Sequence, residues 1–189
     1  SVEAITAKNS TQITKDLGAN AFSLIFNFLP IALNERNNFH AWEQVQLGAS
    51  IAGIAMMNAG GGPVSGVSYP VGVFYQVPHG IAGGIFLSGV FKQNIKKGYR
   101  GYSALFNSIS NSNHSDLDEL EKSAKFLALF NDFYQDIGAP KTLRKWGIEK
   151  ITDVENLVNY TILDRIENLE LNPVPYGKED LTELLMGIL

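Results

Sequence analysis

The chain has 189 residues, of which 45% are hydrophobic, and a formal net charge of −4 at pH 7. A domain of this length usually buries about 70% of its unfolded surface, so we expect one sizeable core. The acidic balance argues against nucleic-acid binding, since no basic stripe is present. The absence of cysteine excludes disulfides, thiolate metal sites and a cysteine nucleophile, and it favours a cytoplasmic location.

Residues 44–91 contain no Asp, Glu, Lys or Arg. A membrane hairpin needs about 20 unbroken apolar residues in each helix, and Asn58, the glycines at 60–62 and Pro63 interrupt this run. The sequence therefore predicts a buried segment at the centre of the core and no membrane span. We expect any active site to lie against it.

Helical periodicity predicts the elements of the first half. The apolar residues of a first helix recur on one face: Leu17, Ala21, Leu24, Ile25 and Phe28. Pro30 stands near the predicted end of that helix. A second helix is expected over 39–58 with Ala41, Val45, Ala52, Ala55 and Met56 on one side. Small residues such as Gly48 and Gly53 favour close approach of a neighbouring helix. A short helix is expected over 64–72, and a long one from His79, because Pro78 suits a helix start.

The second half has clearer helix boundaries. Ser115, followed by Asp118, predicts an N-cap, and Gly138 predicts the end of that helix. Its inward residues are expected to be Leu117, Leu120, Ala124, Leu127 and Phe130. Thr152 and Glu155 have the spacing of a capping box ahead of Leu157, Val158, Ile162 and Ile166. A last helix follows Gly177. The sequence thus predicts an all-α, multi-helix bundle of about seven to nine helices, with a polar linker over 107–115 and strand-like alternation only at 71–77.

Few residues of the charge-free segment carry chemistry. His79 has three interpretations: a metal ligand, a general base, or a core imidazole bonded to backbone groups. A transition metal needs about three or four ligands, and within residues 44–91 only His79, Ser65 and Tyr69 can contribute. These do not make a closed site. The other histidines, His40 and His114, are expected on the surface. The chain has no nucleophile elbow, no P-loop and no glycine fingerprint between a strand and a helix.

Residues 62–87 read GPVSGVSYPVGVFYQVPHGIAGGIFL. This stretch resembles the C-terminal helical domain of the iron-containing (group III) alcohol dehydrogenases, where the segment reads approximately VHAMAHPLGGFYDIPHGVANAILLPHV. Further matches extend the resemblance over essentially the whole chain: Glu3-Ala4 with Thr14, Asn27 to Pro30, Gly48 to Ser50, Asn58 to Gly60, Ile137 to Pro140, Asn172-Pro173 and Glu179-Asp180.

The resemblance implies a fold and a set of partners. It implies one helical domain over 1–189, of the dehydroquinate synthase-like type, which pairs with an N-terminal NAD(P)-binding α/β domain absent from this chain. Because the chain begins without an initiator Met, we expect it to be a piece of a longer polypeptide. In the family, Fe²⁺ or Zn²⁺ lies in the cleft between the two domains, and the substrate is a small alcohol or aldehyde. A homodimer is left open.

The family's motifs also imply site residues. The metal ligands transfer to His79 and, fourteen residues earlier, to Ser65; the family's Asp and first His would lie upstream of Ser1. The second motif histidine transfers to Tyr69, whose phenol can hydrogen-bond a substrate oxygen. Two positions depart from the family: a serine hydroxyl is a much poorer ligand than imidazole, and Ser88-Gly89 replaces a later histidine.

Three functions remain open. In the first, the chain is the helical half of an NAD(P)-dependent oxidoreductase. In the second, it is a degenerate metal-free relative that acts as a structural or interaction domain. In the third, it is a stand-alone binding module with a pocket around His79 and Tyr69. In each case we expect the isolated chain to bind neither NAD(P) nor a stoichiometric metal ion, and to be inactive alone.

Overall fold

The structure is a computed structural model that describes residues 1–110, 114–148 and 150–189, without the side chains of 145, 151 and 152. Every regular element in this part of the chain is helical. The helices are α1 (Val2–Thr6), α2 (Gln12–Asn34), α3 (Phe39–Ala59), α4 (Pro63–Tyr75), α5 (His79–Gly84), α6 (Leu87–Lys96), α7 (Tyr102–Ile109), α8 (Glu119–Asp136), α9 (Ile151–Asp164), α10 (Ile166–Glu170) and α11 (Lys178–Met186), with a short 3₁₀ turn at Arg144–Trp146.

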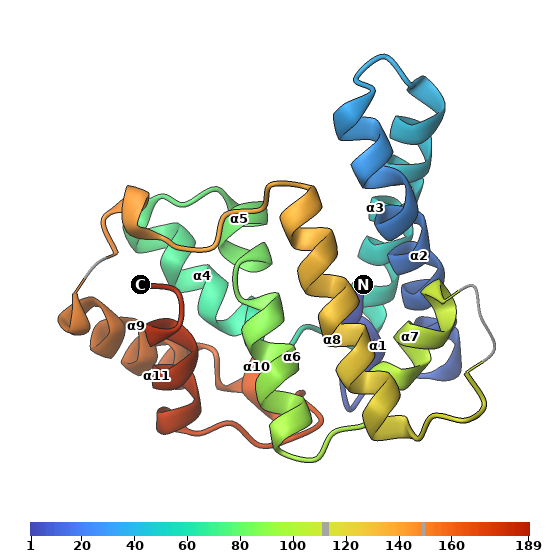
Figure 1. Ribbon diagram of the computed structural model, residues 1–189. Helices are drawn as coiled ribbons and strands as arrows, with labels where there is room; N and C mark the ends of the chain where they lie inside the picture. Colours follow the sequence, from blue (N-terminus) through green and yellow to red (C-terminus); the bar gives the residue numbers. More distant parts are fainter. Residues whose placement is uncertain (111–113, 149) are drawn as a thin grey trace.

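The helices form two groups on either side of α6 (Figure 1). On one side, α2 and α3 pair as a long hairpin whose tip projects away from the rest of the molecule, and α1, α7 and α8 lie at its base. On the other side, α4, α9, α10 and α11 pack together, with α5 beside α4. The chain therefore brings its N-terminal helix α1 and its late helix α10 to the same region, near the start of α4.

Each group has its own apolar core. The group containing α4 buries aliphatic side chains, among them Val67, Val71, Leu157, Leu181 and Leu185. The group containing α8 buries aromatic rings, among them Phe22, Phe91, Phe126 and Phe130. A third, small cluster of alanines lets α1 approach α3 closely: Ala4, Ala7, Ala55 and Ala59. Burial of this apolar surface is the main term that holds the helices together.

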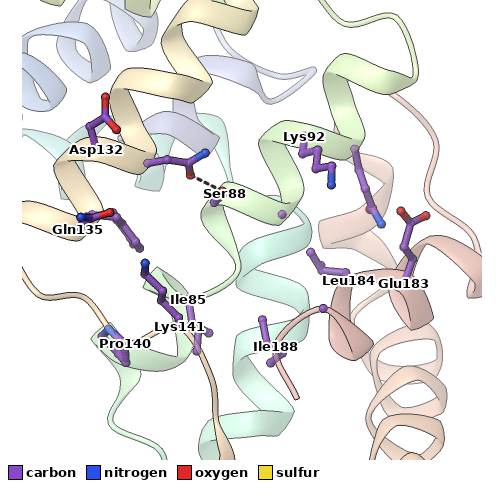
Figure 2. A pocket seen from close by; sticks show the side chains of 15 residues that line it. Ile85, Ser88, Lys92, Asp132, Gln135, Pro140, Lys141, Glu183, Leu184 and Ile188 are labelled. Atoms are coloured by element: carbon purple, nitrogen blue, oxygen red, sulfur yellow. Dashed lines mark hydrogen bonds between the residues drawn. The ribbon is translucent and has the colours of Figure 1, made fainter.

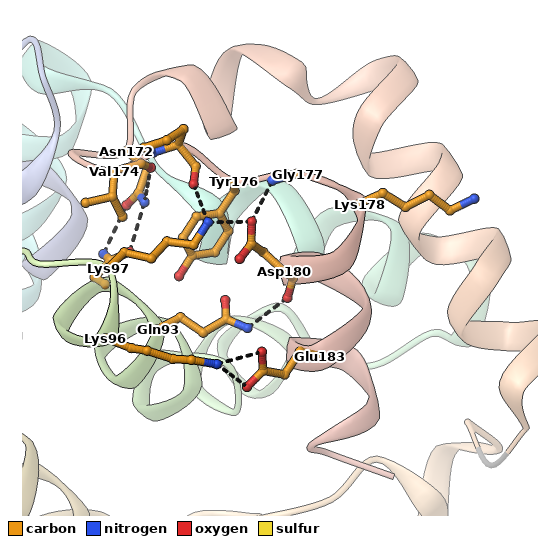
Figure 3. A network of polar contacts seen from close by, with 12 residues as sticks. Gln93, Lys96, Lys97, Asn172, Val174, Tyr176, Gly177, Lys178, Asp180 and Glu183 are labelled. Carbon is orange, nitrogen blue, oxygen red and sulfur yellow. Dashed lines mark hydrogen bonds and ion pairs between the residues drawn. The ribbon is translucent and has the colours of Figure 1, made fainter.

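A polar network ties α6 to the C-terminal part of the chain (Figure 3). The buried side chains of Asn94 and Asn172 exchange hydrogen bonds of 3.1 and 2.9 Å. Lys97 Nζ donates to Asp180 Oδ2 at 2.6 Å and to the Pro175 carbonyl at 2.7 Å. Buried polar groups of this kind are costly unless they are bonded. The network therefore fixes where α11 lies on α6.

Most predicted helices are present, and some boundaries differ. The hairpin helices, the end of α8 at Gly138 and the last helix after Gly177 are confirmed. The first helix continues past Pro30 to Asn34. The long helix predicted from His79 is wrong, because the chain forms α5 and α6 with a break between them. Residues 71–75, read as strand-like, belong to α4, and the expected number of helices was too low because the short helices have little periodicity.

Two predicted N-caps are also wrong. Asp118, not Ser115, caps α8: its side chain accepts from the Glu121 N–H, and Glu121 accepts from the Asp118 N–H. The buried face of α8 accordingly contains Ser123 and Phe126, whereas Leu120 and Ala124 are exposed. Thr152 lies inside α9, which starts at Ile151, and the side chain of Thr152 is outside the described residues. Ile166 falls in α10 and is exposed. Of the predicted linker, 107–109 belong to α7, and 111–113 are not among the described residues.

The expectation that residues 44–91 are buried throughout is only half correct. The part in α4 supplies core residues such as Val67 and Val71. On α3, in contrast, Ile54 and Met57 are 53% and 89% exposed, and Met56 is exposed although its spacing predicted an inward position. The charge-free segment therefore has two parts: α4 contributes to the core, whereas α3 exposes apolar side chains on the outer side of the hairpin.

One helix, α2, is long and apolar enough to cross a membrane by length and composition. It lies outside the charge-free segment, and it pairs with α3 along the hairpin. A helix of a packed domain passes the same test of length and apolar composition.

Candidate functional site

The N-terminus of α4 is closed by a carboxylate from α1. Glu3 Oε1 accepts a hydrogen bond of 2.7 Å from the Val64 N–H, and Glu3 Oε2 accepts one of 3.2 Å from the Ser65 N–H. The Ser65 hydroxyl donates to Glu3 Oε2 at 2.5 Å. The first N–H groups of a helix have no partner within the helix, and they attract negative charge. Glu3 therefore acts as the cap of α4, since Gly62 at the N-cap position has no side chain.

The sequence around Gly62 leaves room for this carboxylate. A Cβ added to Gly62 would lie 2.7 Å from Glu3 Oε1, which is closer than real contacts allow. Burial raises the pKa of Glu3 above its usual range, and the hydrogen bonds from Ser65 and Val64 act in the opposite direction. Glu3 is thus a partly buried acid whose charged form is disfavoured by burial, and donors on a single helix offset part of that effect.

Tyr69 follows Ser65 by one turn of α4, so both side chains lie on the same face of the helix. Tyr69 is 44% exposed. The guanidinium carbon of Arg165 lies 3.5 Å from the centre of the Tyr69 ring, and the ring of Tyr160 lies 6.5 Å away at an interplanar angle of 16°. Arg165 stands at the junction of α9 and α10. The tertiary fold thereby places a cation against the exposed tyrosine.

Asn168 of α10 completes this region. A Cβ added to Gly61 would lie 2.7 Å from Ser65 Oγ and 3.0 Å from Asn168 Nδ2, so both polar groups border the backbone at Gly61. A Cβ on Gly66 would lie 3.4 Å from Asn168 Cβ. The glycines let α10 approach α4 closely. The result is a polar patch at the start of α4, formed by Glu3, Ser65, Tyr69, Arg165 and Asn168, which we call the α4 site.

His79 lies elsewhere on the charge-free segment. It is the first residue of α5, directly after Pro78, as its sequence context predicted, but its side chain is exposed and α5 buries only Ala82. The turn before it contains Gln76, which adopts a left-handed conformation with φ of 53°. Among the described residues the His79 side chain has no hydrogen-bond or ion-pair partner. Of the other histidines, His40 is exposed, and His114 is half-buried with its ring 4.9 Å from that of Phe106.

Sequence reasoning missed three residues of the α4 site. Glu3 was noticed only as part of a family match, because no local spacing connects it to Ser65, 62 residues later. No local pattern indicates Arg165 or Asn168. One signal was available for Arg165: it is the single Lys or Arg between Lys150 and Lys178. An isolated cation in an otherwise acidic and apolar stretch is a candidate for a specific role.

The donor set of the described residues does not fit a transition-metal site. Such a site takes about three or four nitrogen, oxygen or sulfur ligands. No group of three His, Cys, Asp or Glu side chains in the described part of the chain is arranged to hold an ion. The Ser65 hydroxyl, moreover, donates a hydrogen bond to Glu3. No chemical step below is therefore derived through a metal ion.

A separate cavity of about 520 Å³ lies between α6, α8 and α11 (Figure 2). Its wall carries charges of both signs: Lys92 and Lys141 are positive, and Asp132 and Glu183 are negative. None of Ser65, Tyr69 and His79 lines it. Its lining includes Gly89, where the family's later histidine would stand, and a Cβ there would lie 2.5 Å from Leu184 Cδ1.

Comparison with known proteins identifies relatives that match most of the chain. The chain is 27% identical over 181 residues to 4-hydroxybutyrate dehydrogenase of Clostridium kluyveri. That alignment covers 95% of this chain and 47% of the relative. It is 31% identical over 144 residues to lactaldehyde reductase of Escherichia coli, in an alignment that covers 76% of this chain and 37% of the relative. The chain thus spans at most about half the length of these curated relatives.

Solved structures agree with this relationship. The fold matches a crystal structure of 1,3-propanediol oxidoreductase with a TM-score of 0.90 and 26% identity, over 100% of this chain and 48% of the other. It also matches the fold of an alcohol dehydrogenase from Oenococcus oeni with a TM-score of 0.89. The sequence model of the "Fe-containing alcohol dehydrogenase family, C-terminal" matches residues 1–189. The chain therefore belongs to the iron-containing alcohol dehydrogenase family, and it corresponds to the C-terminal, all-helical domain of that family.

Proposed function

We propose that this chain is the substrate-side half of an NAD(P)-dependent oxidoreductase that interconverts a small alcohol and the matching carbonyl compound. The nucleotide belongs to an N-terminal domain of the parent polypeptide, and the parent acts in the cytoplasm. The observation that carries the proposal is the position of Tyr69: it is exposed, one turn from Ser65, in a chain whose relatives are alcohol dehydrogenases and reductases.

The residues of the α4 site have different roles in the proposed reaction. The Tyr69 hydroxyl donates a hydrogen bond to the substrate oxygen and stabilises charge that develops there. Glu3 fixes the first turn of α4 through Val64 and Ser65, which keeps the Tyr69 backbone in place. The nicotinamide, when bound, accepts or donates the hydride. His79 and Ser65 stand at the family's ligand positions, and Fe²⁺ or Zn²⁺ in the parent would need further ligands from outside the described residues.

The test is turnover of primary alcohols by the parent polypeptide with NAD or NADP. Tyr69→Phe keeps the ring against Arg165 and removes the hydroxyl, so kcat is expected to fall by about 100-fold, the usual scale for one hydrogen bond to a reacting oxygen. Tyr160→Phe is the matched control, because the same atom is removed from the neighbouring ring. Equal effects of the two changes would contradict the role of Tyr69, and absence of any turnover in the wild type would contradict the proposed activity.

One observation favours a second function. The Ser65 hydroxyl, at a ligand position of the family, is bonded to Glu3, as expected for a metal-free relative that keeps the fold as a structural domain. In that case Ser65→His in the parent should raise zinc affinity by orders of magnitude if the other ligands are in place, because imidazole replaces a neutral hydroxyl. Zinc titration measures this. Tight zinc binding by the unmodified parent would contradict the metal-free alternative.

A further inference from the structure

We propose that Arg165 binds an anion at the α4 site, and that this anion is the carboxylate of a short hydroxy acid or of the matching aldehyde acid. The inference rests on the proposed function in one respect, since it takes Tyr69 to lie beside the reacting oxygen. It adds a substrate class and a residue that selects it. The argument depends on the partners, the geometry and the surroundings of the guanidinium.

Arg165 has unused hydrogen-bonding capacity. Its Nε atom is enclosed, and it has no hydrogen-bond partner among the residues that the structure describes. Arg165 also takes part in none of the ion pairs found among them. A guanidinium carries five N–H donors and stays charged at every physiological pH. Enclosing Nε without an acceptor is costly. Because Arg165 as a whole is only half-buried, its terminal N–H groups are the donors left for an acceptor from outside.

The guanidinium is also held in a fixed orientation. Its central carbon lies 3.5 Å from the centre of the Tyr69 ring, which is face contact. A guanidinium that rests with one face on a ring presents its N–H groups along its edge. That edge matches the two oxygens of a carboxylate and forms two parallel hydrogen bonds with them. Because the contact orders the side chain beforehand, less entropy is lost on binding.

The surroundings favour a carboxylate over a phosphate. Phosphates bind readily at helix N-termini, where several N–H groups are free. At the start of α4 these groups are already bonded to Glu3, which leaves a single cation, Arg165, and the neutral amide of Asn168 near Gly61. One planar cation and one neutral donor suit a singly charged, planar anion. Since Arg165 contacts the Tyr69 ring directly, we expect a ligand that reaches both the guanidinium and the Tyr69 hydroxyl to be short.

The experiment compares hydroxy acids with neutral alcohols of the same length in the parent polypeptide: 3-hydroxypropionate with 1-propanol, and 4-hydroxybutyrate with 1-butanol. For Arg165→Gln we expect kcat/KM for the hydroxy acids to fall about 10- to 100-fold, the range for a charge-assisted bidentate contact. We expect kcat/KM for the neutral alcohols to fall less, because they lose only the contact that holds the Tyr69 ring, so the ratio between the two substrate classes carries the inference. Arg165→Lys keeps the charge without the planar edge, so its loss should be intermediate. Arg36→Gln, at the exposed hairpin tip, is the matched control and should change neither class.

A binding measurement keeps this inference separate from the proposed function. Butyrate and its neutral analogue butyramide are titrated calorimetrically into the parent polypeptide, which requires no turnover. Weaker butyrate binding in Arg165→Gln, with butyramide unchanged, supports the anion site even if no variant oxidises an alcohol. Equal binding of the two compounds to the wild type would overturn the inference. So would an Arg165→Gln protein that raises KM for NAD(P) while it keeps the preference for hydroxy acids, because the anion would then be a cofactor phosphate.

Discussion

Glu3 shows how one half-buried acid connects two helices that are distant in the sequence. Its carboxyl group is enclosed at the start of α4, and it accepts hydrogen bonds from Val64 and Ser65. Burial raises its pKa, so the folded protein holds the Glu3 proton more tightly than the unfolded chain does. The folded state therefore loses stability when that proton leaves.

This shift predicts a pH dependence of stability. As pH rises from about 4.5, the ordinary pKa of this group, through the raised folded pKa, the contribution of Glu3 to the free energy of unfolding should decrease. Glu3→Gln keeps an acceptor for the α4 N–H groups without a titrating proton, so its unfolding free energy should decrease less across this window. Urea unfolding of both proteins at a series of pH values measures the difference. Glu179→Gln, at an exposed position, is the control, and identical slopes for Glu3→Gln and wild type would contradict the assignment.

Ser65 has a structural role that can be tested without catalysis. Ser65→Ala removes the 2.5 Å hydrogen bond to the buried Glu3 carboxyl group, and leaving a buried acceptor short of a donor costs about 1–3 kcal/mol. Ser50→Ala is a matched change, since Ser50 Oγ donates to the Gln46 carbonyl on the exposed side of α3. Its effect should stay within about 0.5 kcal/mol. Chemical unfolding at neutral pH measures both, and equal costs would show that the Glu3–Ser65 bond adds nothing.

At the scale of elements, only one of the two glycines inside α3 lies at the contact with α2. A Cβ on Gly48 would lie 2.9 Å from Ile25 Cγ1 and 3.1 Å from the Ala21 carbonyl oxygen, whereas a Cβ on Gly53 would meet nothing within 4 Å. The sequence predicted a close helix pair from the small residues of α3. It did not indicate which glycine is at the contact, because that depends on the rotation of one helix against the other.

The two glycines allow a paired prediction within one helix. Gly48→Ala should destabilise the protein by about 1–3 kcal/mol, since the backbone of α2 blocks the added methyl group. Gly53→Ala should stabilise it by about 0.5–1 kcal/mol, because alanine favours an exposed helix interior more than glycine does. Thermal unfolding followed by circular dichroism compares them. A stabilising Gly48→Ala would show that the two helices can separate at little cost.

The sequence predicted elements better than their ends and contacts. Periodicity located α3 and α11, and glycines located two helix ends, because these signals are local. At α8 both Ser115 and Asp118 have capping chemistry, and the Glu121 that completes the capping box with Asp118 was the overlooked local signal. In the α4 site only Ser65 and Tyr69 were predicted, through family motifs. Glu3, Arg165 and Asn168 come from α1, the α9–α10 junction and α10, and no spacing within the sequence reveals that these meet α4.

At the scale of the whole molecule, the C-terminal turns of α3 carry large apolar side chains on their exposed side. Ile54 and Met57, one turn apart on α3, are 53% and 89% exposed. Clustered apolar residues of this kind promote association, so we expect the 189-residue chain to self-associate as its concentration increases. Replacing Ile54 and Met57 together by Lys should shift the chain toward monomer in sedimentation velocity. Leu163→Lys, which changes an isolated exposed side chain on α9, should have little effect, and a wild-type chain that is monomeric at every concentration would contradict the prediction.

The arrangement of the hairpin has a consequence for the order in which the chain folds. The helices α2 and α3 are consecutive, and they pack mainly on each other, so their contacts become available once residue 59 has been synthesised. The side chain of Asn94, in contrast, cannot form its hydrogen bond until Asn172, 78 residues later, has been synthesised. Local contacts form early, and distant ones pay a larger closure entropy. On the ribosome the hairpin is therefore expected to assemble first, whereas α6 acquires its fixed position only when the C-terminal segment arrives.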